Sequence, residues 1–197
     1  MNTPTISPND ILVRAQDTPN PSAVKFIMNY AVKSEGKATF HHPDEAEKIP
    51  LARDLFLISG VKQLYFFENT ITITHDSLLD PTHFEEQVTA IIKTRLPSHD
   101  YQFRTVEESS FPKNPVDRSH LSPILQQIES ILDRTIRPGL QADGGDVEVL
   151  EFENDELKIL YQGACGGCPS SMMGTLDAIQ GILRHELGNE KLRVYPI

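Results

Sequence analysis

The residues with the clearest chemical potential are the two cysteines of the chain, Cys165 and Cys168, which are separated by two glycines. They lie in the segment Gly163-Ala164-Cys165-Gly166-Gly167-Cys168-Pro169-Ser170. Two thiolates cannot by themselves complete a four-ligand zinc site or an iron–sulfur cluster held by cysteines. Either the pair carries out redox chemistry alone, or a second copy of the chain supplies the two missing ligands.

The sequence predicts that the pair lies between the end of a strand and the start of a helix. The free N–H groups and the positive dipole end at a helix start stabilise anions. Such a setting lowers the pKa of a thiol and favours the thiolate, which is the form that binds metal or attacks disulfides. Gly163, Gly166 and Gly167 remove side chains around the sulfur atoms, so a bulky inorganic core and a second backbone can approach closely.

Three other interpretations of the cysteines remain open on the residues alone. A thioredoxin-like dithiol–disulfide pair also lies at a helix start, but usually within a βαβ pattern, whereas here a helix and a hairpin come first. A zinc ion bridging two chains is chemically allowed, because zinc also takes four thiolates. A structural disulfide would close a loop too small to stabilise the chain much. The surroundings favour the cluster over these three.

The composition is that of an acidic, globular protein. The chain has 197 residues, of which 39% are hydrophobic, and carries a net charge of −10. This charge argues against a nucleic-acid partner, and no apolar run approaches the ~20 residues of a membrane span. The first residues show neither a secretory signal nor the Arg-rich character of a transit peptide. Two close cysteines in such a chain predict a cytoplasmic location, although a processed organellar form would look the same.

The first half, residues 1–105, alternates short apolar runs with turn signals. Residues 61–67 and 71–74 predict a hairpin of β-branched strands. Asp80-Pro81 then supplies a helix cap and a proline at the first helical position, and apolar residues follow at helical spacing. Residues 106–119 are polar and contain two prolines, which predicts an interdomain linker.

The second half, residues 120–197, predicts the order α-β-β-α-β. Its first helix starts after Ser122-Pro123 and is expected to end at Pro138-Gly139, and residues 143–146 are expected to form a tight turn. Residues 147–152 and 157–161 predict a hairpin, a second helix starts at Pro169, and residues 192–195 predict a last strand. The whole chain is therefore expected to be an α+β protein of two small domains, each with helices layered on a sheet.

Three motifs of the second half stand together in a recognisable way: Ile136-Arg137-Pro138-Gly139-Leu140, Asp143-Gly144-Gly145-Asp146-Val147 and the cysteine segment 163–171. They resemble the C-terminal domain of NifU/Nfu iron–sulfur proteins. In the first half, Thr18-Pro19-Asn20-Pro21, residues 50–56 and Ile71-Thr72-Ile73-Thr74 resemble the Nfu N-terminal domain. The resemblance covers nearly the whole chain, in the expected domain order.

The resemblance implies a function that the residues alone leave open. In the family, the cysteine pair holds a [4Fe–4S] cluster shared between two protomers, and the cluster is passed on to apo-proteins. By motif match this role falls on Cys165 and Cys168. The family usually has Thr-Leu-Lys in the following helix, where Gly174 begins the corresponding stretch here. Phe84 stands where the family has a tryptophan.

The resemblance therefore implies a cluster scaffold and carrier without catalytic residues. The expected cofactor is a [4Fe–4S] cluster bridging two chains, formed either directly or through a [2Fe–2S] intermediate. The expected partners are a second copy of the chain, upstream cluster-assembly proteins and apo iron–sulfur targets, with no nucleic acid and no membrane. A dithiol–disulfide oxidoreductase and a zinc-bridged dimer are the competing functions.

Overall fold

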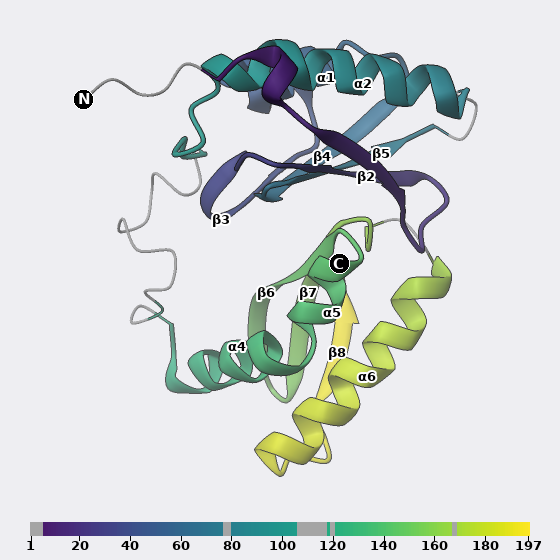
Figure 1. The fold of residues 1–197 in the computed structure, drawn as a ribbon. Coiled ribbons are helices and arrows are strands. Elements are labelled where there is room, and N and C mark those ends of the chain that lie inside the picture. The colour runs from purple at the N-terminus through teal and green to yellow at the C-terminus, as the bar shows by residue number, and fades with distance from the viewer. Residues whose placement is uncertain (1–5, 77–79, 106–117, 119–120, 167–168) are drawn as a thin grey trace.

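The computed structural model describes residues 6–76, 80–105, 118, 121–166 and 169–197, and the side chains of the last range from residue 174 onward. The chain is an α+β protein of two domains, each with its own sheet (Figure 1). Each sheet has a separate cluster of buried apolar side chains. The expected linker, residues 106–119, lies outside the described residues except for Arg118, so its boundaries stay a prediction.

The first domain is built on a five-stranded antiparallel sheet with the order β1-β2-β5-β4-β3. Its strands are β1 (Val13–Asp17), β2 (Ala23–Met28), β3 (Lys33–Phe40), β4 (Val61–Glu68) and β5 (Thr70–His75). The α-helices α1 (Pro50–Phe56) and α2 (Pro81–Arg95) and the short 3₁₀ helices η1 (Pro8–Asp10), η2 (Pro43–Ala46) and η3 (Leu96–Ser98) complete it. The predicted hairpin of β4 and β5 is confirmed, and Glu68 makes its tight turn with a φ of 49°.

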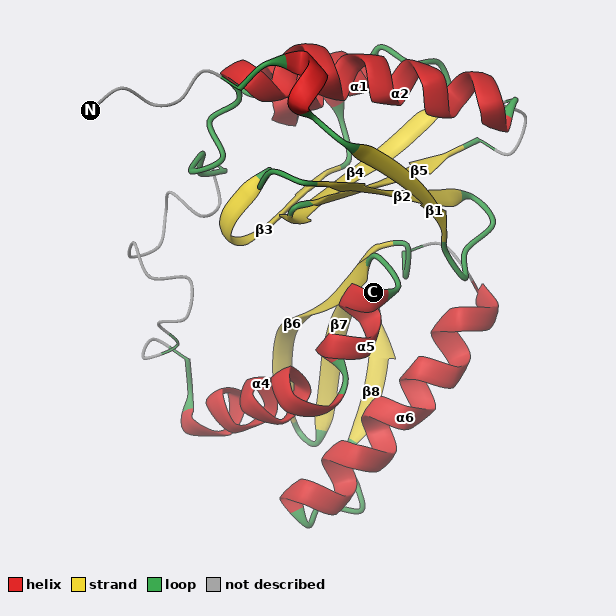
Figure 2. Ribbon diagram, viewed as in Figure 1, coloured by secondary structure: helices red, strands yellow, loops and turns green. Residues whose placement is uncertain are grey.

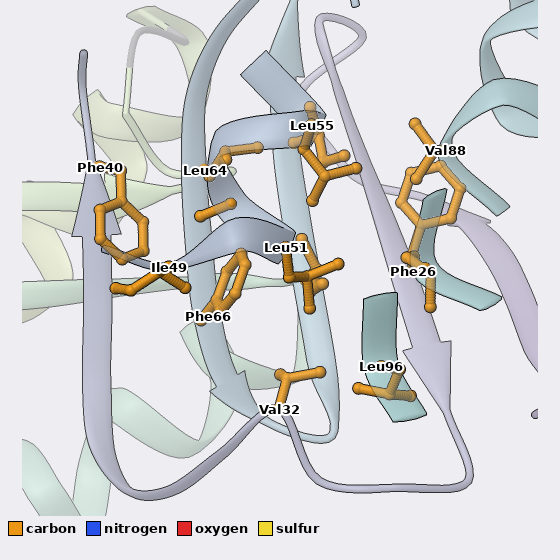
Figure 3. Close-up of a cluster of buried hydrophobic side chains, with 14 of the residues drawn as sticks. Phe26, Val32, Phe40, Ile49, Leu51, Leu55, Leu64, Phe66, Val88 and Leu96 are labelled. Atoms are coloured by element: carbon orange, nitrogen blue, oxygen red, sulfur yellow. The ribbon is translucent and has the colours of Figure 1, made fainter. Parts of the chain in front are cut away.

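The two faces of this sheet differ because successive side chains of a strand point to opposite sides. Phe26, Leu64 and Phe66 point to the face that α1 and α2 cover, where they form the core (Figure 3). The cap of α2 is confirmed, since the Asp80 side chain accepts a hydrogen bond from the His83 N–H at 2.8 Å. The opposite face is polar, and it carries the cross-strand neighbours Lys25, Thr72 and Tyr65.

The second domain packs its helices on a three-stranded sheet with the order β6-β7-β8. Its elements are α4 (Pro123–Thr135), α5 (Arg137–Ala142), β6 (Gly145–Glu153), β7 (Glu156–Gly163), α6 (Pro169–Leu187) and β8 (Arg193–Pro196). Strands β6 and β7 form the predicted antiparallel hairpin, whereas β8 runs parallel to β7 after the crossover helix α6. Ile128, Leu132, Ile179 and Leu183 are fully buried between the helices and the sheet.

Two expectations for this domain need correction. The chain does not leave helical geometry at Pro138-Gly139, because both residues lie within the short helix α5. Proline is tolerated there since the first turn of a helix requires no N–H donor. Residues 143–146 are also not one turn: Gly144 has the positive φ of a turn, 82°, but Gly145 and Asp146 are already paired in β6.

The two domains lie against each other through the polar face of the first sheet. Figure 2 shows this sheet above the end of the β6–β7 hairpin, with α1 and α2 on its far side. Lys25 and Tyr65 contact the second domain there and are 7% and 1% exposed. The contacts gather at the end of the hairpin where β7 leads into Cys165.

Among the described residues, no helix is long and apolar enough to cross a membrane.

Candidate metal centre

Cys165 lies in the connection between β7, which ends at Gly163, and α6, which begins at Pro169. It is half-buried, whereas its neighbour Ala164 is only 3% exposed. The structure therefore agrees with the predicted position of Cys165 between a strand end and a helix start. Cys168 lies outside the described residues, so the assignment of both cysteines as ligands stays a prediction.

The backbone around Cys165 is anchored to the start of β6. The Ala164 N–H donates to the Gly144 carbonyl at 3.0 Å, and the Gly166 N–H donates to the Gly163 carbonyl at 3.0 Å. Gly163 itself has a positive φ of 61°, a conformation that glycine adopts without strain. We call residues 163–166 the cysteine loop.

Gly145 makes room for Cys165. A Cβ atom added at Gly145 would overlap the Cys165 Sγ and would lie 2.8 Å from the Cys165 backbone N. Real Cβ atoms essentially never come within 3.0 Å of such atoms. The thiol of Cys165 therefore lies directly over a backbone position where only glycine fits, which gives a chemical reason for the second glycine of the 143–146 motif.

Asp146 is the polar centre beneath the cysteine loop and is 2% exposed. Its carboxylate accepts hydrogen bonds from the Tyr65 hydroxyl at 3.2 Å and from the Gln141 side chain at 3.3 Å. Lys37 lies 3.1 Å away and Arg137 3.4 Å away, both as ion-pair partners. Since Tyr65 and Lys37 belong to the first domain, Asp146 joins the two domains.

Arg137 extends this network into the second domain and is 8% exposed. Its guanidinium donates to Glu129 at 2.7 and 3.2 Å, and to the Val147 carbonyl at 3.1 and 3.3 Å. Although burial lowers the pKa of Arg137, the hydrogen bonds to Glu129 outweigh that effect and raise it. The guanidinium is thus held charged, and it fixes α4 and β6 relative to each other.

Two tyrosines flank the loop. Burial and, to a lesser extent, the negative charge that Cys165 can carry raise the pKa of Tyr161 to about 12. Burial and the nearby Asp146 raise the pKa of Tyr65 far above its usual value. Both phenols are therefore neutral at physiological pH, and the Tyr65 hydroxyl acts as a donor to Asp146.

The first domain contributes groups that the sequence interpretation missed. The Asn20 side chain donates to the carbonyls of Ala164 and Gly166, and the Lys25 ammonium donates to the Ala142 carbonyl at 2.7 Å. Burial lowers the pKa of Lys25, and Asp143 partly counters that effect. The polar residues Lys25 and Thr72 interrupt otherwise apolar strands, and this pattern is visible in the sequence. The sequence does not show that these side chains face the second domain.

The described residues hold no second candidate for the metal. Among them, no group of three or more histidine, cysteine, aspartate or glutamate side chains is arranged to hold a metal ion.

The fold and the cysteine loop define a two-domain α+β protein with a candidate thiolate site at the end of a β-hairpin. Two family profiles match these domains: residues 13–99 match the scaffold protein Nfu/NifU N-terminal domain, and residues 128–194 match the NifU-like domain. The chain belongs to the Nfu/NifU family, as the sequence motifs predict.

Similar proteins from other organisms match this chain across both domains. The NFU1 iron-sulfur cluster scaffold homolog of Homo sapiens, a mitochondrial protein, is 34% identical over 88% of this chain and 67% of its own length. The mitochondrial NifU-like protein 5 of Arabidopsis thaliana is 28% identical over 92% of this chain and 66% of its own length. The chain thus spans about two thirds of the length of these relatives. A solution structure of a NifU-like protein from Saccharomyces cerevisiae aligns with a TM-score of 0.41 and 21% identity, over 50% of this chain and 85% of that one.

Proposed function

We propose that this protein is an iron–sulfur cluster scaffold and carrier. The proposal is supported by the two matching family profiles and by the names of the relatives, which include an iron–sulfur cluster scaffold homolog. The observation that carries it is the position of Cys165 on a half-exposed glycine loop, between the end of β7 and the start of α6. In this proposal Cys165 and Cys168 are the ligands of the chain.

The cluster is cargo in this proposal. The two thiolates of one chain hold half of a [4Fe–4S] core, which takes four cysteine ligands, and a second copy of the chain supplies the other two. The N–H groups at the start of α6 stabilise the negative charge of the thiolates and of the core. Because Cys165 is half-exposed, an incoming thiol of an apo-protein can replace it, which is the exchange that delivery requires.

The chain itself catalyses no turnover in this proposal. A dithiol–disulfide oxidoreductase using the same cysteines is the enzymatic alternative, and a zinc-bridged dimer is the non-enzymatic one. Upstream assembly proteins supply the cluster, and apo iron–sulfur proteins accept it.

The cytoplasmic location predicted from the sequence is not tested by the fold. The relatives named above are mitochondrial. Location therefore stays a prediction, and the proposed chemistry does not depend on it.

The test is anaerobic reconstitution of the full chain with iron and sulfide. The wild-type protein should give a brown, broadly absorbing product containing iron and sulfide, whereas Cys165→Ser and Cys168→Ser should each hold no stable cluster. Ala178→Ser, on an exposed position of α6, is the matched control and should load as the wild type does.

Circular dichroism of every variant shows whether the fold is retained. A normal cluster on either single cysteine variant would contradict the ligand assignment. Dithiol turnover without metal would support the oxidoreductase instead, and zinc in protein purified without air would support the zinc-bridged dimer.

A further inference from the structure

Asn20 lies in the turn between β1 and β2 of the first domain, yet its side chain reaches the cysteine loop of the second. Its Nδ2 group is 3.1 Å from the Ala164 carbonyl oxygen and 3.3 Å from the Gly166 carbonyl oxygen. Asn20 is 5% exposed, and its bond to the Ala164 carbonyl is buried while its bond to the Gly166 carbonyl is partly buried. An amide NH₂ group has two N–H donors. The two carbonyls within reach belong to the residues immediately before and after Cys165.

The turn around Asn20 holds this side chain in place. The Asn20 Oδ1 accepts a hydrogen bond from the Ser22 N–H at 3.0 Å, so the amide is oriented with its NH₂ group toward the loop. The Asn20 N–H donates to the Thr18 Oγ1 at 3.2 Å, and the Thr18 hydroxyl lies within hydrogen-bond distance of the Asn20 and Ala23 carbonyls. The segment Thr18-Pro19-Asn20-Pro21 is therefore a rigid support for one side-chain amide.

The cysteine loop needs such support because glycines flank Cys165 on both sides of the segment. Gly163 and Gly166 have wide backbone freedom, which costs conformational entropy when the loop is ordered. The Asn20 bond to the Ala164 carbonyl fixes the peptide group that precedes Cys165. The Gly166 N–H bond to the Gly163 carbonyl fixes the peptide group that follows it. Together these bonds define the backbone conformation of Cys165.

Independent contacts keep Asn20 over the loop. The Tyr65 hydroxyl and the Lys37 ammonium contact Asp146 at 3.2 and 3.1 Å, and Lys25 donates to the Ala142 carbonyl at 2.7 Å. A Cβ atom at Gly144 would lie 2.7 Å from the Thr72 Oγ1, which shows how closely the first sheet approaches the motif beside the loop.

We propose that Asn20 is a positioning residue for the cysteine loop, through which the first domain pre-organises Cys165 for its ligand. The ordering of the loop needs no ligand. Its consequence for cluster retention rests on the function proposed above. A preformed loop loses less conformational freedom when it binds, so the bound cluster is held more firmly.

The test is hydrogen–deuterium exchange of the full-length apoprotein, followed in peptides that contain residues 161–166. Asn20→Asp keeps the acceptor for the Ser22 N–H but turns a carboxylate oxygen toward the two loop carbonyls. Asn20→Ala removes both donors without adding charge. Each variant should exchange the Ala164 and Gly166 amides roughly tenfold faster than the wild type, because the two hydrogen bonds that hold the loop carbonyls are lost.

Asn29→Asp is the matched control. Asn29 also accepts a backbone N–H bond, from Leu12 at 2.9 Å, and donates to a carbonyl, that of Asp10 at 2.9 Å. It lies just past the other end of β2, a strand of 6 residues that is about 20 Å long at ~3.3 Å per residue. Asn29→Asp should leave exchange in the cysteine loop unchanged. Exchange of the α2 amides reports in every variant whether the first domain is folded.

A second readout connects the loop to the cargo. After anaerobic reconstitution, a chelator should remove iron from Asn20→Ala roughly tenfold faster than from the wild type, and from Asn29→Asp at the wild-type rate. Loop exchange that is unchanged in both Asn20 variants, or equally fast in Asn29→Asp, would overturn the proposal. A wild-type protein that takes up no cluster would instead overturn the proposed function and leave the exchange result standing.

Discussion

At the scale of single residues, the absence of a side chain at Gly145 decides whether Cys165 can occupy its position. Gly145→Ala adds a methyl group where the Cys165 sulfur and backbone N lie. We expect this variant to lose most of its cluster after reconstitution and to be destabilised by about 1–3 kcal/mol, as overpacked sites are. Iron per chain and urea unfolding measure both effects.

Gly139→Ala is the control for this substitution, because a Cβ atom at Gly139 has no neighbour within 4 Å. It should load iron as the wild type does. If Gly145→Ala loads as much iron as Gly139→Ala, Cys165 does not depend on the space above Gly145.

A second residue-scale prediction concerns His99, which is packed against Phe66 and Phe103 and lies 2.8 Å from the Val32 carbonyl. Burial lowers the pKa of His99, although the Val32 carbonyl and Asp100 counter it. The unfolded chain therefore takes up a proton near pH 6.5 that the folded chain takes up only at lower pH. The free energy of unfolding should consequently fall as the pH drops below about 6.5.

The measurement is urea unfolding between pH 7.5 and about 5. His99→Gln retains a donor for the Val32 carbonyl but cannot titrate, so its stability should depend less on pH across this window. His42→Gln, whose side chain is 68% exposed in the wild type, should keep the wild-type dependence. A pH dependence that is the same in all three proteins would contradict the assignment.

The residues of the candidate site were only partly predictable. The cysteine pair and its place before a helix follow from residue types and spacing. The contacts of Asn20 and Tyr65 with the second domain do not follow from spacing. Asn20 lies 144 and 146 residues before its two partners, and Tyr65 lies 81 residues before Asp146. No local pattern encodes such a pairing. Thr18-Pro19-Asn20-Pro21 was noticeable as a family motif, but its physical role required the fold.

At the scale of elements, local signals worked where a cap or an alternation determines the structure. The caps Asp80 and Ser122 are confirmed by their hydrogen bonds to the helix backbone. The hairpin predicted from residues 147–152 and 157–161 is confirmed, and it turns at Asn154 and Asp155, which have positive φ values of 50° and 65°. Helix α5 was missed because Pro138-Gly139 usually ends a helix, whereas here it lies inside one. All of these sequence signals are local. The meaning of Pro138-Gly139 differs because it depends on whether the proline ends one helix or begins the next.

Helix α6 offers an element-scale prediction. Gly174 and Gly181 lie inside it, and a Cβ atom at either position would meet nothing within 4 Å. Alanine at each position should therefore stabilise the second domain by about 0.5–1 kcal/mol, because it reduces the backbone freedom of the unfolded chain. Urea unfolding of the single and double variants measures this gain.

Gly188 is the control, since it has equal space but a positive φ of 61° just after the helix ends. Gly188→Ala should destabilise the protein, because alanine is strained in that conformation. A gain in stability for Gly188→Ala, or a loss for both helix variants, would show that backbone conformation is not the deciding factor.

At the scale of the whole molecule, the arrangement of the two domains follows from the alternation of side chains on the first sheet. One face is apolar and binds α1 and α2, and the other presents Lys25, Lys37 and Tyr65 to the second domain. Figure 1 shows the ribbon of the first sheet lying between these helices and the second domain. From sequence, a polar strand face is expected to face water, so this docking could not be predicted. The α+β class and the two-domain organisation could be, because each half has its own apolar pattern.

The central claim is that two chains share one cluster through Cys165 and Cys168. Each chain offers two thiolates and a [4Fe–4S] core takes four, so cluster binding and dimerisation should be one event. The two-fold axis should pass through or near the cluster. Removal of the cluster should therefore weaken the dimer strongly.

Light scattering of the anaerobic protein, with iron analysis before and after chelation, tests this claim most directly. The filled protein should have the mass of two chains and ~4 iron atoms per two chains. After chelation it should dissociate, with a mass that depends on protein concentration. A filled protein that stays monomeric, or an apoprotein that is an equally tight dimer, would contradict the account.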